Sequence, residues 1–267
     1  MPIPGYQTIR ADPAVGALQG VGNAWSRRLF DGTFYRSRPG PELPAVSLVF
    51  VQSRGGNTVA DNPQTLGGGD TDKHLIYEGL SRVDADAVLA GATTARGEKM
   101  VFSVWHPELV RLRTELGRSR HPAQVIVTDR ADLPFDRGLM FQVPELSVIV
   151  ITKSSAVPAL RQRLCQRPWV DVIDAGEPVS LTRAMRELAA RGMRVISAVG
   201  GRRTAIALLQ EQLIGDVYLT TSAIEAGEPN TPFYDGTAPP MTQLIEKAGV
   251  GPEAGVRFEH LLISGSR

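Results

Sequence analysis

Short apolar runs alternate along this chain with segments in which apolar residues recur every three or four positions. The apolar runs lie at 45–52, 86–90, 124–128, 147–152, 170–173, 195–199 and 217–221. Nearly continuous runs of this kind are typical of strands that are buried on both faces. The segments with helical spacing lie at 71–83, 107–116, 156–164, 181–191 and 202–212. This alternation predicts an α/β protein with a mostly parallel sheet and helices on both faces.

The two ends of the chain depart from this alternation. Residues 242–248 and 256–264 predict two strands joined by the glycine-rich loop 249–255, which gives a C-terminal antiparallel hairpin and therefore a mixed sheet. Residues 1–44 are rich in Pro, Gly and Arg, with one short apolar element at 25–30, and three prolines close the segment. We therefore expect an N-terminal extension at 1–44, largely an extended arm, and one main domain at 45–267.

Turns rich in small or polar residues follow several of the predicted strands. They stand at Gly55, Gly91, Asp129, Lys153 and Gly200. The carboxyl ends of parallel strands share one edge of a sheet, and ligands of such sheets bind beyond that edge. These turns are therefore expected to converge on one ligand site.

The last of these turns is a pair of glycines between a buried strand and a helix. Gly200 and Gly201 lack a Cβ, so the backbone can bend sharply there and a ligand can approach closely. The first N–H groups of the following helix and the positive end of its dipole favour an anion, typically a phosphate. Arg202 and Arg203 add formal charge at the same point. The alternative is a strand–helix turn in which glycine only relieves crowding.

The composition of the chain argues against several other classes of protein. The 267 residues carry a formal net charge of +1, which gives no concentrated basic face for nucleic acid. The single cysteine excludes an internal disulfide and a multi-cysteine zinc site, and the four histidines are spread along the chain, so no metal is expected. No apolar run approaches the ~18 residues of a membrane span. Without a recognisable secretory signal, we expect a cytoplasmic protein.

Four segments between 45 and 264 now combine into a recognisable pattern. Residues 86–98 form an apolar strand followed by a small-residue turn that contains Thr, Arg and Glu. Residues 199–201 end in the diglycine, and residues 208–220 lead through Leu and Asp into the next strand. Residues 227–233 form a closing loop with the sequence Gly-Glu-Pro-Asn-Thr-Pro-Phe. In this order they resemble the reductase domain of the bifunctional deaminase/reductases of riboflavin biosynthesis.

The resemblance implies a dihydrofolate-reductase-like fold, NADPH as the hydride donor and a homodimer. It implies that the diglycine and the start of the next helix bind the pyrophosphate, and that Thr94 lies against the cofactor. Arg130 would pair with the 2′-phosphate, beside Thr128 and Asp129 at the adenosine end, and Thr152 would line the adenine. The cofactor-binding residues so implied are Gly91, Thr94, Thr128, Asp129, Arg130, Thr152, Val199, Gly200, Gly201, Arg202, Thr204 and Ala205.

On the substrate side, the resemblance points to Ser53, Arg82 and Glu98. Glu98 is the candidate catalytic acid, because a carboxyl in a closed pocket can hold a proton, and the alternative is a solvated loop glutamate. Arg82 is either a clamp for a substrate phosphate or carboxylate, or an ordinary arginine at a helix end. Ser53 binds the substrate or carboxamide, or else serves only the turn after its strand.

The chain also departs from the family pattern. The loop at 53–56 has no acidic residue where the family usually has Ser-Leu-Asp-Gly, and Val199 stands where a Glu usually precedes the two glycines. The zinc-binding deaminase half is absent, so the resemblance is to a stand-alone reductase. The cofactor side of the family's site is therefore kept better than the substrate side.

These observations lead to one main hypothesis and two alternatives. The main hypothesis is an NADPH-dependent reductase that transfers a hydride to a small heterocyclic substrate, resembling 5-amino-6-(5-phosphoribosylamino)uracil reductase. The first alternative is a protein that binds NADPH without turnover, which the missing acidic residues suggest. The second is an analogue of dihydrofolate reductase.

Overall fold

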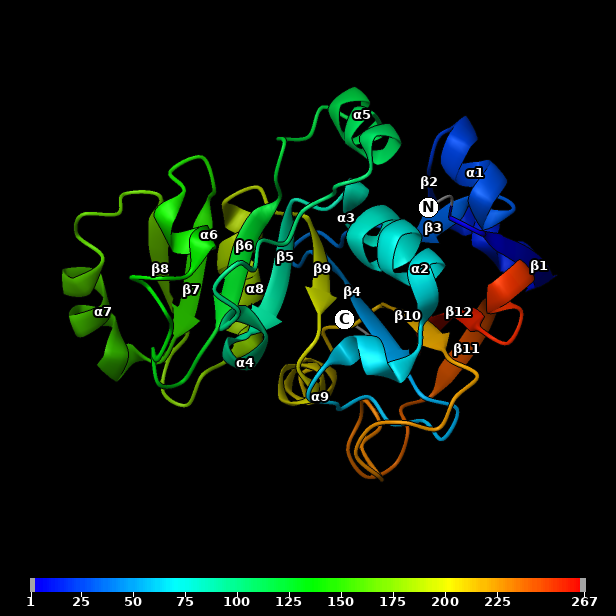
Figure 1. Ribbon diagram of the computed structural model, residues 1–267. Coiled ribbons are helices and arrows are strands. Elements are labelled where there is room, and N and C mark those ends of the chain that lie inside the picture. Colours follow the sequence, from blue (N-terminus) through cyan, green and yellow to red (C-terminus); the bar gives the residue numbers. More distant parts are fainter. Residues whose placement is uncertain (1–2, 265–267) are drawn as a thin grey trace.

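A sheet of ten strands runs through the whole molecule in this computed structural model, which describes residues 3–264 (Figure 1). The strand order is β1-β11-β12-β10-β4-β9-β5-β6-β7-β8. The strands are β1 (Tyr6–Ala11), β4 (Ala45–Gln52), β5 (Ala87–Gly91), β6 (Ala123–Val127), β7 (Val148–Thr152), β8 (Val170–Asp174), β9 (Val195–Val199), β10 (Asp216–Thr221), β11 (Met241–Gly249) and β12 (Arg257–Ile263). A separate hairpin joins β2 (Gln19–Val21) and β3 (Phe34–Arg36).

The seven strands from β10 to β8 are parallel to their neighbours, whereas β12, β11 and β1 continue the sheet in antiparallel pairs. β11 and β12 are the hairpin expected at the C-terminus. The predicted mixed, mostly parallel sheet with a closing antiparallel hairpin is therefore confirmed. Its strands begin and end within about two residues of the predicted limits, because continuous apolar runs mark strands that are covered on both sides.

Helices cover both faces of the sheet, as predicted. They are α1 (Ala24–Phe30), α2 (Gly69–Thr71), the π-helix η3 (Asp72–Leu80), α3 (Ser81–Val83), α4 (Ala92–Ala95), α5 (Pro107–Glu115), α6 (Leu139–Gln142), α7 (Val157–Arg163), α8 (Leu181–Ala190) and α9 (Arg202–Gln210). Short 3-10 turns are η1 (Pro13–Ala17), η2 (Pro63–Leu66), η4 (Ser154–Ala156) and η5 (Gly251–Glu253).

The core is divided by the sheet into two apolar layers. Leu75 and Ile76 of η3 pack with Val49 and Val199 on one face, whereas Leu188 of α8 lies in the layer on the other face. Alternate residues of β4 and β9 enter the two layers, which is the pattern of strands buried on both sides. No helix among residues 3–264 has the length and apolarity needed to cross a membrane.

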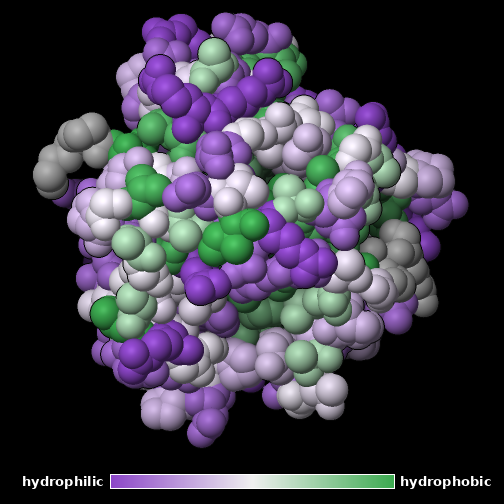
Figure 2. Space-filling model, turned by 90° about the vertical axis from the view of Figure 1, so that its right-hand side faces the viewer, coloured by the Kyte–Doolittle hydropathy of each residue, from purple (hydrophilic) through white to green (hydrophobic). Residues whose placement is uncertain are grey.

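The N-terminal segment is folded onto the sheet, and the expectation of a largely extended arm does not hold for it. β1 pairs with β11, and the ring of Tyr6 contacts the rings of Phe30 and Phe258 with centroids 6.2 and 5.8 Å away. The segment offered little sequence signal because its strand exposes most of its side chains. Figure 2 shows the side of the molecule that carries α1 and β1, where small hydrophobic areas are separated by hydrophilic residues. A domain boundary near residue 45 stays a prediction.

Candidate functional site

The diglycine after β9 adopts the backbone conformation that its sequence suggests. Gly200 has φ +65° and Gly201 has φ +80°, a region that side chains strongly disfavour. A Cβ added to Gly200 would lie 3.2 Å from the side chain of Thr94. Glycine is therefore required both by the turn and by the close approach of α4.

The neighbouring strand brings a third glycine to the same place. A Cβ on Gly91, the last residue of β5, would lie 2.4 Å from the Thr204 hydroxyl. A Cβ on Gly201 would lie 3.7 Å from that hydroxyl and 3.9 Å from the Gly91 nitrogen. β5 and β9 are adjacent and parallel, so their carboxyl ends meet at one edge (Figure 1). Five predicted cofactor residues thus come together: Gly91, Thr94, Gly200, Gly201 and Thr204.

The start of α9 offers hydrogen-bond donors at this edge. The Gly201 carbonyl accepts bonds from the N–H groups of Thr204 and Ala205, at 3.0 and 3.1 Å. Within residues 3–264, the N–H groups of Arg202 and Arg203 have no acceptor, and no side chain caps the helix. Free N–H groups at the positive end of a nine-residue helix can donate hydrogen bonds to an anion, so this helix start is a candidate anion site.

Three other residues predicted to bind the cofactor at this turn have side chains that are not available to a ligand. The Arg202 guanidinium is held by the loop that follows β10, through Nε to the Pro232 carbonyl at 2.6 Å and Nη2 to the Tyr234 carbonyl at 2.9 Å. The side chains of Val199 and Ala205 are buried in the two opposite core layers. These three can therefore serve an anion through backbone groups but not through their side chains.

The residues predicted for the adenosine end follow β6 and β7, further along the same edge. The Thr128 hydroxyl accepts from the Ala131 N–H at 3.1 Å, and Asp129 and Arg130 are exposed. Within the described part of the chain, no side-chain partner holds Arg130, so its guanidinium can meet a ligand. Thr152 is fully buried, and its hydroxyl has no hydrogen-bond partner there.

The structure does not bring the three predicted substrate residues together. Ser53 is buried, and its hydroxyl accepts from the Asn57 N–H at 3.3 Å, as in a turn. Arg82 precedes β5 at the opposite edge of the sheet, where its guanidinium lies 4.2 Å from the Tyr77 ring centroid and Nη1 donates to the Ser103 carbonyl. Only 1% of Arg82 is exposed, and burial lowers the pKa of its guanidinium. It therefore cannot clamp a ligand at the diglycine.

Glu98, the candidate acid, lies on the surface. Its side chain is 59% exposed and pairs with Arg137 at 3.4 Å. This arrangement corresponds to the alternative of a solvated loop glutamate, because no closed pocket surrounds the carboxyl.

A carboxyl that the sequence analysis did not select is buried near the same edge. Asp72 begins η3, and its Oδ1 accepts from the Thr220 hydroxyl at 2.5 Å. The signal for it was the helical spacing of Asp72, Ile76 and Leu80, which places a carboxyl on the apolar face of the helix. Burial raises the pKa of Asp72 to about 7. The hydrogen bond from Thr220 lowers this pKa, and the nearby Glu253 carboxylate raises it further.

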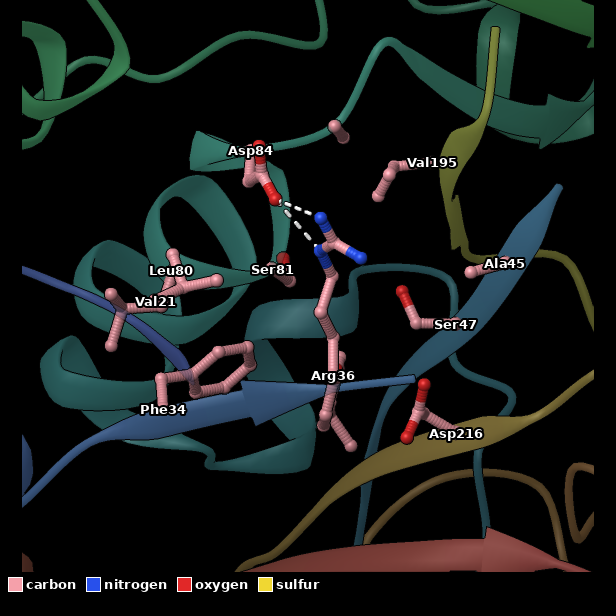
Figure 3. A pocket seen from close by; sticks show the side chains of 12 residues that line it. Val21, Phe34, Arg36, Ala45, Ser47, Leu80, Ser81, Asp84, Val195 and Asp216 are labelled. Carbon is pink, nitrogen blue, oxygen red and sulfur yellow. Dashed lines mark hydrogen bonds and ion pairs between the residues drawn. The ribbon is translucent and has the colours of Figure 1, made fainter. Parts of the chain in front are cut away.

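Two cavities lie away from the diglycine. One is at the amino ends of β4 and β9, where Arg36 points toward Asp84 and pairs with it (Figure 3), and its volume of about 10 Å³ is at the limit for one water molecule. The other has a volume of about 370 Å³ and is lined by Arg96, which follows α4, by residues 132–137 and by Arg163. Its arginines are already paired: Arg96 with Asp132, Arg163 with Asp136 and Arg137 with Glu98.

A mostly parallel sheet with a diglycine turn and uncapped helix N–H groups at its carboxyl edge defines an α/β protein with a candidate anion site at that edge. Comparison with known families identifies it further. The chain belongs to the RibD C-terminal domain family, whose model matches residues 55–249. A comparison with curated proteins found no match.

Solved structures with the same fold agree with this family. A pyrimidine reductase-like protein from Corynebacterium diphtheriae is 25% identical, with a TM-score of 0.68 over 82% of this chain and 92% of that chain. RibD from Acinetobacter baumannii is 16% identical, with a TM-score of 0.64 over 84% of this chain and 59% of that chain. The riboflavin biosynthesis reductase of Saccharomyces is 14% identical, with a TM-score of 0.59 over 84% of this chain and 92% of that chain. The mixed, mostly parallel α/β fold class expected from the sequence is thus confirmed, and the chain spans about 59% of the longer Acinetobacter protein.

Proposed function

We propose that this chain is an NADPH-dependent reductase that transfers a hydride to a small heterocyclic substrate of the pyrimidine type. The observation that carries the proposal is the cradle formed by Gly91, Gly200 and Gly201 in front of the free N–H groups of α9. Family membership supports the reductase class, and a solved relative is itself described as pyrimidine reductase-like. The substrate proposed first is 5-amino-6-(5-phosphoribosylamino)uracil, which the description of another solved relative names.

The residues at the carboxyl edge fit a dinucleotide. A Cβ at Gly91 or Gly200 would collide with the side chain of Thr204 or Thr94, so glycine at these positions lets the two threonines lie against the turn where a pyrophosphate would bind. The N–H groups of Arg202 and Arg203 would donate to its oxygens, and the Thr94 and Thr204 hydroxyls stand beside the same turn. When bound, NADPH supplies the hydride, so the protein's task is to hold and orient the reactants and to exclude water.

The first test is cofactor binding by calorimetry with NADPH. Gly200→Ala is expected to raise the Kd roughly tenfold or more, a loss of about 1.4 kcal/mol or more, because its Cβ meets Thr94 3.2 Å away. Gly117→Ala is the matched control: Gly117 has φ +68°, close to the +65° of Gly200, but nothing lies within 4 Å of an added Cβ. Both variants carry the backbone strain of a positive φ, Gly200→Ala should lose somewhat more stability because of the contact with Thr94, and only Gly200→Ala should lose affinity. No NADPH binding by the unaltered protein at sub-millimolar concentration would refute the proposal.

A second test addresses the preference for NADPH over NADH. Arg130→Ala is expected to weaken NADPH binding by about 1.5–3 kcal/mol, the range for a hydrogen bond to a charged group, and to leave NADH binding unchanged. The reason is that Arg130 is exposed after β6, with its guanidinium free to pair with the 2′-phosphate. Equal losses for the two cofactors would contradict this role.

Binding of NADPH without turnover remains the second candidate, and the exposed position of Glu98 favours it. NADPH oxidation in the presence of 5-amino-6-(5-phosphoribosylamino)uracil, and separately of dihydrofolate, distinguishes the two candidates and also tests the dihydrofolate reductase alternative. A homodimer and a cytoplasmic location are further parts of the proposal. Light scattering of the purified protein measures the first, and fractionation of the producing cells measures the second.

A further inference from the structure

Two loops beyond the carboxyl ends of β4 and β10 are joined to each other. Their backbone hydrogen bonds run from the N–H of Arg54 to the carbonyl of Ile224, from Thr58 to Thr231 and from Glu228 to Val59, at 2.8 to 2.9 Å. The Asn57 amide adds a bond to the Ala226 carbonyl at 3.2 Å. Residues 53–59 and 222–235, called the paired loops below, therefore hold each other in place. In Figure 1 they lie below β4, next to α9.

Arg202 connects the paired loops to the first turn of α9. Its Nε donates to the Pro232 carbonyl at 2.6 Å and its Nη2 to the Tyr234 carbonyl at 2.9 Å. Among residues 3–264, no other hydrogen bond joins α9 to the paired loops. Between the two carbonyls, Phe233 is buried, with its ring centroid 6.2 Å from that of Phe50. Arg202 and this ring contact therefore set where the paired loops stand relative to the start of α9.

The helix itself does not favour an arginine at this position. The positive end of a helix dipole disfavours a cation, and the first turn of α9 has no acidic residue to compensate. The next residue, Arg203, is exposed, whereas the guanidinium of Arg202 donates to two carbonyls at once. A planar fork can do this, but a lysine ammonium is a single point on a flexible stem. The contacts with the paired loops therefore explain why the side chain at 202 is an arginine.

The paired loops stand on the nicotinamide side of the proposed cofactor site. The adenosine end is proposed to lie after β6 and β7, and the pyrophosphate at the diglycine after β9. In the strand order β10-β4-β9-β5-β6-β7, the loops that follow β4 and β10 lie on the other side of the diglycine from β6 and β7. A dinucleotide that extends along this edge therefore carries its nicotinamide half toward the paired loops.

We propose that Arg202 is a positioning residue for the nicotinamide half of the cofactor, an inference that rests on the proposed function. Its guanidinium holds the paired loops as a wall beside that half, while its backbone N–H donates to the pyrophosphate. The nicotinamide half and the fixed loops then stabilise each other, because coupling between two sites is reciprocal.

The test compares two ligands that differ only in the nicotinamide. One is NADPH, and the other is 2′-phosphoadenosine diphosphoribose, which has the same adenosine end and pyrophosphate. Calorimetry with Arg202→Ala should show an affinity for NADPH that falls about fivefold or more beyond any change for the shorter ligand. The reason is that the freed loops no longer stand beside the nicotinamide, whereas the backbone N–H groups still meet the pyrophosphate.

Arg203→Ala is the matched control. It removes the same formal charge from the same helix turn, but within residues 3–264 its exposed side chain holds no carbonyl of the paired loops. A loss that arises from charge near the pyrophosphate should be equal for the two ligands, so the ratio of their Kd values should not change. Arg202→Lys keeps the charge and loses the fork. It carries the test if the alanine variant does not fold, and its ratio should shift in the same direction by a smaller factor.

Limited proteolysis of the paired loops gives a readout that does not depend on affinity, because each ligand is used at saturation. In the unaltered protein, NADPH should slow cleavage between residues 232 and 235 more than the shorter ligand does. In Arg202→Ala, the two ligands should give the same cleavage rate.

Two results would overturn the inference. Equal loss of affinity for both ligands in Arg202→Ala would show that the arginine acts on the pyrophosphate alone, and unchanged affinity for both would show that the loops do not border the nicotinamide. NADPH still binds the unaltered protein in both cases, so the cofactor site stands. Failure of the unaltered protein to bind NADPH would instead remove the proposed function, and this inference with it.

Discussion

At the scale of single residues, burial distinguishes two carboxyls that residue type alone makes equivalent. Glu98 and Asp72 are both carboxyls near the carboxyl edge, but Glu98 is 59% exposed on its side chain whereas Asp72 is 8% exposed. Sequence reasoning preferred Glu98 because it follows a strand within a familiar motif. Which carboxyl is buried depends on β1, β10 and η5, which come from distant parts of the chain and surround Asp72.

The first prediction concerns the pH dependence of stability. The pKa of Asp72 is raised from 3.8 to about 7 on folding, so its contribution to stability is fully present below about pH 4 and is lost as the pH rises to about 7. Asp72→Asn cannot ionise and should not show this loss. Relative to the unaltered protein, its free energy of unfolding should therefore rise by a few kcal/mol between pH 4 and pH 8, at about 1.4 kcal/mol for each pH unit of difference.

Urea denaturation at a series of pH values measures this effect. Asp70→Asn is the control, because its exposed carboxyl should give the same pH dependence as the unaltered protein. If the stability difference between Asp72→Asn and the unaltered protein did not change with pH, Asp72 would have to be ionised at the same pH in both the folded and unfolded states.

At the scale of elements, the sequence was most informative where one element faces apolar surroundings on both sides. The strand predicted at 45–52 is β4, and the strand at 195–199 is β9. The helix predicted at 71–83 is instead divided into α2, η3 and α3, with Gly79 outside helical geometry at φ −129° and ψ −108°. A Cβ added to Gly79 would lie 2.7 Å from the Leu109 side chain and 2.8 Å from the His74 carbonyl. The break at Gly79 therefore goes with a close tertiary contact to Leu109, which helical spacing in the sequence does not reveal.

The element-scale prediction concerns Arg202, whose side chain ties the first turn of α9 to the loop after β10. Arg202→Ala should lower the free energy of unfolding by about 2 kcal/mol or more, because two carbonyls lose a charged donor. The exposed ion pair with Asp235 adds little. Arg203→Ala, the adjacent exposed arginine, should change stability by about 0.5 kcal/mol or less.

Chemical denaturation gives the two free energies, and limited proteolysis reports the loop directly. Cleavage between residues 232 and 235 should become faster in Arg202→Ala only. Equal protection of the loop in both variants would show that other contacts hold it.

At the scale of the whole molecule, the sequence predicted the layered sheet but not where its first strand belongs. Alternation indicates parallel strands joined by crossover helices, but it does not give their order, in which β9 lies between β4 and β5. β1 has mostly exposed side chains and pairs only with β11, so neither periodicity nor a neighbouring strand in sequence marked it. The division at residue 44 came from proline content, which reports local backbone preference and not packing.

A chain that begins at Ala45 tests this division. It would lose the rings of Tyr6, Phe30 and Phe34 that cover Phe258, at about 1.5–3 kcal/mol for each large buried side chain. It would also lose the Arg36–Asp84 ion pair. The sum approaches the total stability of about 5–15 kcal/mol of a typical domain, so the fragment is expected to be unfolded or aggregated.

Circular dichroism and size-exclusion chromatography of the fragment, beside the full chain, provide the measurement. A monodisperse 45–267 fragment with an unchanged melting temperature would show that residues 1–44 are a separable extension.

The pairing of β1 with β11 has a consequence for how the protein is made. Tyr6 lies opposite Gly249 in the sheet, so β1 has no partner strand until β11 has been synthesised. At about 5–20 residues per second, that interval is roughly 10 to 50 seconds. During that interval the rings of Tyr6, Phe30 and Phe34 lack their contacts with Phe258, and a chaperone that shelters nascent chains would find them exposed.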